Sequence, residues 1–407
     1  MHIEEIARFS KIKGLDIVGT GDFTHPKWLS EMEEVLVEQS DTGLYKVAKN
    51  SESPVYFIVT TEVSTVYTLD KDVKKVHHVI FAPNIETAIQ INERLEKYCD
   101  LAVDGRPTLN INAPHLVEEV MEVSSENMVF PAHAWTPWFS IFGAFNGFNS
   151  IKECYQDMAK HIHALETGLS SDPPMNWRLS KLDKFTLVSN SDSHSFWPWR
   201  IGREANVFEF ETLSYREVVD AIRLNDRERF KFTIETNPAY GKYHWTGHRN
   251  CNVALSPQEA EKLRNICPVC RRKLTKGVEQ RIEELADRPA GFKPKNAAGF
   301  MRLLPLSEII EVVLGVSSPY ARRVWNIYNR LVEKFGNEYA VMMDVSKKAL
   351  SEVVDEEIAE AIVRVREGKV KVMPGYDGVY GKLFIFEDTL LEETLPRKQQ
   401  LNLTEFM

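Results

Sequence analysis

The chain has 407 residues, which is more than one ordinary domain, so we expect two or three domains. Its formal net charge of −9 argues against a uniformly basic surface, and its apolar runs fall short of the roughly 18 residues that a membrane span needs. The five cysteines cannot all pair, and no signal segment opens the chain, so we expect a soluble, cytoplasmic protein without a membrane partner.

The N-terminal segment predicts a helix, a strand and a polar turn. Apolar residues at helical spacing predict a helix over 3–13 that ends at Gly14, and a short strand follows. Two glycines then let the backbone turn and leave Asp22 and His25 at the C-terminal end of that strand. In an alternative interpretation, Asp22 only caps the next helix, over 28–38.

Two further β-prone runs carry candidate ligands. One is expected to end at Glu62, and the other begins with His77 and His78. Because side chains alternate along a strand, only one of the two histidines can face a given side. Helices over 86–98 and 115–123 are expected to follow.

Acids and histidines recur at the ends of later strands. One strand leads into an aromatic-rich loop that carries His133, and another ends at Glu166. The apolar run 185–188 stops abruptly before Asp192 and His194. Residues i and i+2 of an extended segment share one face, so this carboxylate and imidazole can point at one metal ion. A lone D-x-H sequence after a strand is more often without function, but here the pattern recurs.

Alternating strands and helices predict a closed or nearly closed parallel barrel, an α/β fold with its active site at the C-terminal strand ends. Mixed imidazole and carboxylate ligands suit zinc, manganese or iron. Two or three such ions clamp a phosphate and lower the pKa of bound water toward about 7, so phosphoester hydrolysis is the expected chemistry. The sequence carries neither a phosphate-binding glycine loop nor a nucleophile elbow.

A second metal site is predicted beyond residue 238. Two close pairs of ligands separated by a loop are typical of a tetrahedral structural zinc site. Four protein ligands leave no open position, so the role of this site is structural. His244 is an alternative to the histidine of the first pair. The expected ligands are His248, Cys251, Cys267 and Cys270.

The remaining chain is helical by pattern and locally basic. Residues 241–345 contain 17 Lys and Arg against 11 Asp and Glu, an excess of 6 positive charges. Arg322 and Arg323 lie among aromatic residues and could form a face that contacts phosphates and stacks on bases. The alternative is that this aromatic stripe is packing within a helical core.

The strand-end segments resemble the motifs of the PHP (polymerase and histidinol phosphatase) superfamily. They read GTGDFTHP, TTEVS, HHVIFAP, PAHAWTPWF and SNSDSH. Together with GHRNC, CPVC and the helical C-terminal region, they resemble the endonuclease Q family, which repairs deaminated bases in DNA. The resemblance implies a distorted (β/α)7 PHP-type barrel over 1–238, a zinc-binding module over 239–290 and a helical DNA-binding domain over 291–407.

The resemblance also implies an activity. A metal-dependent endonuclease of this family recognises uracil, hypoxanthine, xanthine or an abasic site in double-stranded DNA and hydrolyses the phosphodiester 5′ of the lesion. It uses two or three divalent ions (Zn, Mn or Mg) in the barrel, besides one structural zinc. We expect Asp192 and His194 to be catalytic, and His78 fits the family's histidine better than His77. The implied metal ligands are Asp22, Glu62, His78, His133, Glu166, Asp192 and His194.

Three further expectations concern DNA. Arg178, Arg322 and Arg323 are expected to bind it. The walls of a base pocket are expected among Trp135, Trp138, Phe139 and the loop 170–178. A contact with a sliding clamp is expected through QQLNLTEF near the C-terminus.

One feature departs from the family. PHP proteins carry an H-x-H motif on the first strand, which this sequence lacks, and Met1 matches an internal position of the family. Two alternatives therefore stay open beside the endonuclease. One is a small-molecule phosphatase, and the other is an inactive DNA-binding remnant of a truncated protein.

Overall fold

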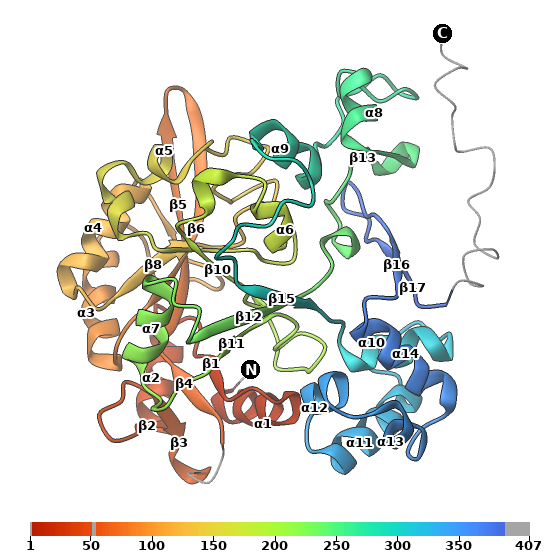
Figure 1. Ribbon diagram of the computed structural model, residues 1–407. Coiled ribbons are helices and arrows are strands. Elements are labelled where there is room, and N and C mark those ends of the chain that lie inside the picture. The colour runs from red at the N-terminus through yellow and green to blue at the C-terminus, as the bar shows by residue number, and fades with distance from the viewer. Residues whose placement is uncertain (1, 51–53, 387–407) are drawn as a thin grey trace.

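The computed structural model describes residues 2–50 and 54–386. Short strands form the middle of the molecule, with helices on their outer side, and a bundle of helices lies apart from them (Figure 1). No helix in these described ranges is long and apolar enough to cross a membrane.

The first sheet is built by the N-terminal residues. Helix α1 (Ile3–Lys13) has the predicted bounds and ends at Gly14, whose φ of 98° closes the helix in the left-handed conformation. Strand β1 is parallel to β4, and helix α2 (Pro26–Val35) follows β1. The strands lie in the order β1 (Ile17–Gly19), β4 (Tyr56–Ile58), β3 (Tyr45–Val47) and β2 (Leu36–Glu38).

The second sheet is dominated by a long antiparallel hairpin of β5 (Thr60–Leu69) and β6 (Asp72–Phe81). Its two-residue turn places Asp70 and Lys71 at φ of 49° and 75°, the left-handed geometry that joins twisted antiparallel strands. The predicted strand end at Glu62 is therefore wrong, because the strand continues seven residues to Leu69. Strands β7 (Thr108–Leu109) and β8 (Met128–Pro131) flank the hairpin.

Two smaller sheets complete the part of the chain that we call the barrel region, the described residues of 2–245 and 277–304. Strand β9 (Ala164–Glu166) is parallel to β10 (Thr186–Val188), whereas β11 (Ala205–Phe208) is antiparallel to β12 (Phe230–Glu235). Strand β12 also pairs with β15 (Gly299–Arg302) in parallel. The expectation of a closed or nearly closed parallel barrel is corrected in its strand direction, since the described strands form separate sheets that contain both parallel and antiparallel pairs.

Helices cover the outer side of these sheets (Figure 1). Apolar faces of α3 and α4 pack into the largest core cluster, and α7 packs into a second one. The helical run over 151–161 is divided into the helix α5 and the 3₁₀ helix η2. The bounds are α3 (Ile85–Leu95), α4 (Ala113–Val123), α5 (Ile151–Tyr155), η2 (Gln156–His161), α6 (Pro173–Asn176) and α7 (Tyr215–Arg223).

A small Cys/His module (residues 246–276) interrupts the barrel region. It contains strands β13 (Thr246–His248) and β14 (Val253–Leu255) and helix α8 (Pro257–Lys262). Helix α9 (Val278–Leu285) then packs against the largest core cluster, and β15 joins the sheet of β12. The chain therefore returns to the barrel region after the module, which the expected boundary at residue 290 did not foresee.

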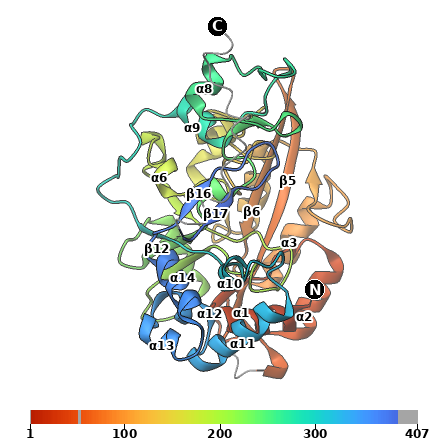
Figure 2. The same ribbon diagram turned by 90° about the vertical axis from the view of Figure 1, so that its right-hand side faces the viewer.

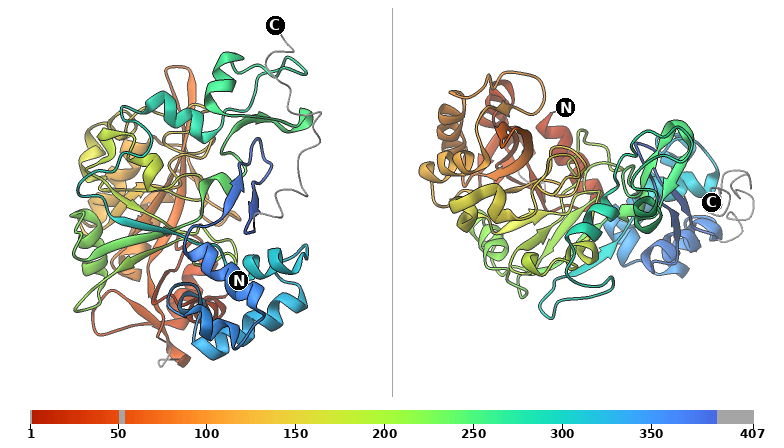
Figure 3. Two further views of the ribbon diagram at one scale, coloured as in Figure 1. Left: turned by 45° about the vertical axis from the view of Figure 1, so that its right-hand side comes forward. Right: turned by 90° about the horizontal axis from the view of Figure 1, so that it is seen from above.

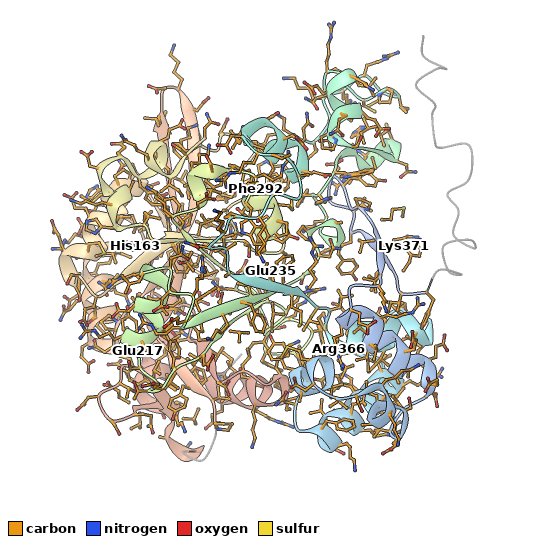
Figure 4. The ribbon with its side chains drawn as sticks, viewed as in Figure 1. His163, Glu217, Glu235, Phe292, Arg366 and Lys371 are labelled. Carbon is orange, nitrogen blue, oxygen red and sulfur yellow. The ribbon has the colours of Figure 1, made fainter. Side chains whose placement is uncertain are left out.

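The helical domain (residues 305–369) packs around an apolar core that is separate from the largest cluster and that Ile234 of β12 also joins. Arg366 fixes α14 to α12 because its guanidinium donates to the carbonyl oxygens of Val341, Met342 and Val345 (Figure 4). The helices are α10 (Leu306–Leu314), α11 (Arg322–Phe335), α12 (Glu338–Met343), α13 (Lys347–Ser351) and α14 (Glu356–Arg366).

A C-terminal hairpin lies between the helical domain and the Cys/His module (Figure 2). It consists of β16 (Lys371–Met373) and β17 (Lys382–Phe384), and its Gly375 amide donates to the carbonyl of Ala239. Seen from above, the helical domain and the module lie on the same side of the barrel region (Figure 3).

Helix α1 and the helical domain are joined by a buried ion pair. The Lys13 Nζ lies 2.6 Å from Glu338 Oε1 and also donates to the Pro198 carbonyl at 2.9 Å. Burial lowers the pKa of Lys13, although the Glu338 carboxylate opposes this shift. Glu338 also accepts from the Tyr328 hydroxyl and the Leu306 amide, so its charge is fully solvated by protein groups.

We expect Lys13→Met to lower the free energy of unfolding by about 3–5 kcal/mol, because it leaves the Glu338 charge buried without its partner. The double variant Lys13→Met/Glu338→Gln should lose less than Lys13→Met alone. Urea denaturation measures both, and exposed Lys11→Met on the same helix is the control, expected within about 0.5 kcal/mol of wild type. Equal losses in Lys11→Met and Lys13→Met would contradict the coupling.

Candidate metal centre

Three side chains from neighbouring strands converge on one point. The Glu62 Oε1 lies 3.2 Å from His77 Nδ1 and 3.3 Å from His133 Nε2, and the two imidazole nitrogens are 2.9 Å apart. All three side chains are largely buried. A carboxylate and two imidazoles are a donor set that suits Zn, Mn or Fe.

The geometry of this trio fits a shared cation. Ligand atoms about 2.0–2.2 Å from one ion lie roughly 3 Å from one another, which matches the three separations observed. The Glu62 Oε1 is buried, and no described residue donates a well-directed hydrogen bond to it. Its neighbours His77, His133 and Arg106 lie close but are poorly directed for hydrogen bonds, and a metal ion would be a better partner for this oxygen.

Electrostatics favour an ionised Glu62 and a neutral His77, whereas the Glu62 carboxylate outweighs the burial of His133 and raises the pKa of that ring, so His133 must release a proton to bind a metal. Burial raises the pKa of Glu62, but the adjacent His133 and His77 rings outweigh it and hold that pKa well below its usual range. Burial lowers the pKa of His77 to about 4, with Glu62 opposing. An ionised carboxylate beside a neutral imidazole is the protonation state in which both act as ligands.

The register of the β5–β6 hairpin decides which histidine joins the centre. Ser64 pairs with His77, and Val63 pairs with His78, so His77 lies on the same face as Glu62 and His78 on the opposite face. The preference for His78 over His77 is corrected by this register. His78 is fully buried, and its ring bonds to the Thr65 and Tyr155 hydroxyls at 2.9 and 2.8 Å.

Glu166 lies next to the trio and binds the backbone of His133. Its Oε2 accepts from the His133 amide at 2.6 Å, and its Oε1 accepts from Asn190 Nδ2 at 2.8 Å. It was expected to be a ligand, but both of its oxygens are used and it stands outside the trio. Burial raises its pKa to about 7, and the Glu62 charge adds to this shift.

The other predicted ligands lie beside the trio along a cavity of about 870 Å³. Asp22, Glu62, Glu166, Asp192 and His194 all line this cavity. The Asp192 Oδ1 is 3.6 Å from His194 Nε2, and the His194 side chain is 83% exposed. Burial raises the pKa of Asp22, and nearby Arg106 opposes this shift.

Arg106 is a site residue that the sequence analysis missed. Its Nε lies 2.8 Å from Glu62 Oε1, and its Nη2 lies 3.6 Å from Asp192 Oδ1. The guanidinium therefore bridges the buried trio and the exposed pair. The only local signal is the turn sequence Gly105-Arg106-Pro107 before β7, which marks a loop but not a function.

Three of the predicted ligands have unusual backbones. Asp22, His133 and Asp192 have φ of 47°, 26° and 40°, in the left-handed region that side chains other than glycine rarely adopt. Backbone strain of this kind costs about 1–3 kcal/mol per residue and gathers at functional sites. His25, in contrast, is the N-cap residue of α2.

The aromatic loop after β8 divides into buried and exposed parts. Trp135 is 1% exposed and donates its indole N–H to Asn176 at 2.7 Å, so it belongs to the core and not to a pocket wall. Phe139 packs on the His77 ring, with 4.9 Å between centroids. Trp138 is 41% exposed and stacks on Phe145, and it is the part of the loop that can meet a flat ligand.

The three arginines that were expected to bind DNA lie in different surroundings. Arg178 makes a two-point ion pair with Glu283 at 2.8 and 2.9 Å, and its side chain is 12% exposed, so little of it is accessible to DNA. Arg322 and Arg323 begin α11 and are exposed, and no ion pair involves them within the described residues. The expected clamp-binding peptide QQLNLTEF lies outside the described residues.

The second predicted metal site is assembled as expected. The ligand atoms of His248, Cys251, Cys267 and Cys270 all lie within 4.8 Å of one another. Four such donors suit a tetrahedral zinc ion. The alternative His244 stands outside this group, and its Nε2 lies 3.5 Å from Glu279 Oε2.

We expect Glu166→Gln to flatten the pH dependence of stability in protein stripped of metal by EDTA. A carboxyl whose pKa rises from 4.5 unfolded to about 7 folded stabilises the fold fully below pH 4.5, and that contribution declines as the pH rises toward 7. Urea unfolding of wild type should therefore lose up to about 3 kcal/mol over this window, and the variant less. Parallel curves for the two proteins would contradict this assignment.

Comparisons with known proteins agree with the overall fold. The structure is similar to the crystal structure of PfuEndoQ, a lesion-specific endonuclease from Pyrococcus furiosus, with a TM-score of 0.84 and 33% identity over 98% of this chain and 94% of that one. It is also similar to endonuclease Q in complex with a 27-mer duplex substrate that has an abasic lesion at the active site, with a TM-score of 0.83 and 33% identity over 99% and 95% of the two chains.

Sequence relatives extend the match. The uncharacterized protein YqxK of Bacillus subtilis is 26% identical over 92% of this chain and 90% of its own length. The uncharacterized protein MJ0043 of Methanocaldococcus jannaschii is 32% identical over 62% of this chain, a match that spans only 31% of MJ0043. Residues 305–369 match the family model of the MJ0043 C-terminal domain. From its similarity to solved endonuclease Q structures over nearly its whole length, the chain belongs to the endonuclease Q family.

Proposed function

We propose that this protein is a metal-dependent DNA endonuclease that cuts the phosphodiester 5′ of a deaminated base or an abasic site. The observation that carries the proposal is the Glu62–His77–His133 trio beside a cavity lined by Asp22, Asp192 and His194. The solved relative bound to an abasic duplex supports double-stranded DNA with a lesion as the substrate.

The ligands divide into a buried set and an exposed set. Glu62, His77 and His133 would hold one divalent ion, and Asp22, Asp192 and His194 would share one or two more. When bound, such ions neutralise phosphate charge and lower the pKa of water. Zinc and manganese both suit this mixture of nitrogen and oxygen donors.

The residues of the chain itself orient the substrate. The Arg106 guanidinium, held between Glu62 and Asp192, is placed to contact a non-bridging oxygen of the phosphate to be cut. Glu166 fixes the backbone of His133 and thereby the direction of its ring. The aromatic loop covers one side of the trio, where Phe139 packs on the His77 ring.

Recognition of the lesion is assigned to the exposed aromatic residues beside the trio. A damaged base leaves the duplex stack at a cost of a few kcal/mol, least where pairing is already weak. Trp138 and Phe145, whose rings are stacked at an interplanar angle of 3°, offer a flat surface near Phe139. Uracil, hypoxanthine and xanthine are planar and can stack there.

The helical domain and the Cys/His module would have binding and structural roles. Exposed Arg322 and Arg323 would contact the DNA backbone, in a region with excess positive charge. The four-ligand Cys/His module would hold a structural zinc, because its donors leave no open coordination position.

We expect His77→Gln to lower barrel metal content and to reduce nicking of an abasic or uracil duplex by at least about 100-fold, because a direct ligand is lost. His78→Gln is the matched control, since this neighbour lies on the other face of β6. It should keep the metal and the activity while losing some stability. Plasma emission spectroscopy and gel-based nicking measure both.

Assays with several substrates distinguish a lesion endonuclease from a small-molecule phosphatase. An unmodified duplex should stay intact, and a phosphomonoester such as p-nitrophenyl phosphate should be hydrolysed far more slowly than the lesion duplex is cut. Hydrolysis of the monoester without nicking would replace the proposal by a small-molecule phosphatase. Loss of metal in His78→Gln but not in His77→Gln would overturn the ligand assignment.

We expect Cys270→Ser to lose one equivalent of zinc and to make residues 246–276 sensitive to protease, because binding of a structural zinc supplies much of the folding energy of so small a module. Cys99→Ser, a cysteine outside the ligand group, is the control and should do neither. Limited trypsin digestion with mass spectrometry reports the result. An unchanged zinc content in Cys270→Ser would contradict a four-ligand site.

A further inference from the structure

The loop that carries Asp192 and His194 is held at its two ends by different parts of the molecule. This ligand loop (residues 189–204) lies between β10 and β11 and contains no helix or strand. At its start, the Ser189 hydroxyl donates to the Ile234 carbonyl, and Asn206 bonds to the Ser189 backbone, so this end is fixed to the barrel sheets. The two predicted ligands lie beyond this anchor.

The far end of the loop is fixed by the helical domain and α1. Tyr339 on α12 donates its hydroxyl to the Gly202 carbonyl at 2.6 Å. Arg203 pairs with Glu308 on α10 at 2.7 Å, and Lys13 on α1 donates to the Pro198 carbonyl. Gly202 has φ of 60°, and a Cβ there would lie 2.8 Å from Lys13 Cγ, so the close contact requires glycine.

Aromatic rings fill the space between these anchors. Trp197 and Trp199 stack with centroids 5.1 Å apart, and both contact the Trp325 ring of α11 at 6.0 and 5.6 Å. Trp199 also meets Tyr320 at 5.9 Å. We define the aromatic cluster as Phe9, Phe196, Trp197, Trp199, Tyr320 and Trp325.

The ligands themselves have few contacts of their own. Asp192 is exposed and His194 is 83% exposed, and the ion pairs that reach them are 3.6 Å long. Their position therefore depends on where the loop ends are held. The part of the loop that carries Asp192 and His194 has few contacts, whereas Trp197, three residues after His194, begins the stacked pair of indole rings.

We propose that the helical domain positions the metal-ligand loop, with Trp325 as the central positioning residue. This inference rests on the proposed ligand role of Asp192 and His194. Trp325 touches no predicted ligand, and it acts through Trp197 and Trp199, which follow His194 in the chain. The domain would thus serve the metal centre as well as DNA.

Trp325→Leu should loosen the loop without removing the DNA surface. We expect amide hydrogen exchange in residues 190–200 to quicken by about tenfold, and the half-saturating concentration of Mn²⁺ to rise by about tenfold. Calorimetric titration of metal-free protein with Mn²⁺ measures the latter. The Kd for an abasic duplex in EDTA, which prevents cutting, should stay within about twofold of wild type.

Two variants separate positioning from simple destabilisation. Trp325→Phe keeps a ring in the cluster and should restore most of the Mn²⁺ affinity. Phe335→Leu removes an aromatic ring from the far end of the same helix, which also packs on the core of the domain but has no ring contact with the loop. It should lower stability without changing loop exchange or Mn²⁺ binding.

Two results would overturn the inference. One is loop exchange and Mn²⁺ affinity that are unchanged in Trp325→Leu, and the other is equal changes in Trp325→Leu and Phe335→Leu. Neither readout involves cutting. If wild type nicked no lesion duplex, the proposed function would fail while exchange and Mn²⁺ binding still tested the positioning role.

Discussion

The structure depends on holding one ionised carboxylate out of water. Glu62 is largely buried near the start of β5, where desolvation alone would raise its pKa. His77, His133 and Arg106 offset that cost, and each is held by a different device: the hairpin register, the Glu166 bond to the His133 amide, and the turn before β7. Removing His77, His133 or Arg106 would leave the negative charge of Glu62 less well compensated.

The two halves of the site differ in how they are built. Glu62 and His77 belong to the two ten-residue strands of a hairpin, whereas Asp192 and His194 belong to a loop between two short strands. The strand-borne half is fixed by backbone pairing before any metal binds. The loop-borne half takes its position from the barrel at one end and from the helical domain at the other. A nuclease that admits bulky DNA benefits from a rigid half that holds metal and an accessible half that meets substrate.

The parts of this arrangement that the sequence predicted are those with local causes. Gly14 ends α1 because its left-handed conformation suits glycine, and the ligand spacing of His248, Cys251, Cys267 and Cys270 reflects a single small module. Predictions that needed partners from elsewhere were less reliable. His78 was preferred over His77 because only the β5–β6 register separates them, and Arg178 looked free because its partner Glu283 is 105 residues away. Arg106 had no local signal at all.

The return of the chain to the barrel region after the Cys/His module has a consequence for how the protein is made. Phe232 pairs with Gly299, 67 residues later, so the β12–β15 edge cannot form until the ribosome has delivered the whole intervening segment. The entropy lost in closing that loop grows with the length of flexible chain inside it. A metal bound at the proposed site of the module would make much of this segment compact and bring its two ends together. Binding of that metal would then set how quickly the sheet is completed, and chains without it would keep an unpaired strand for longer.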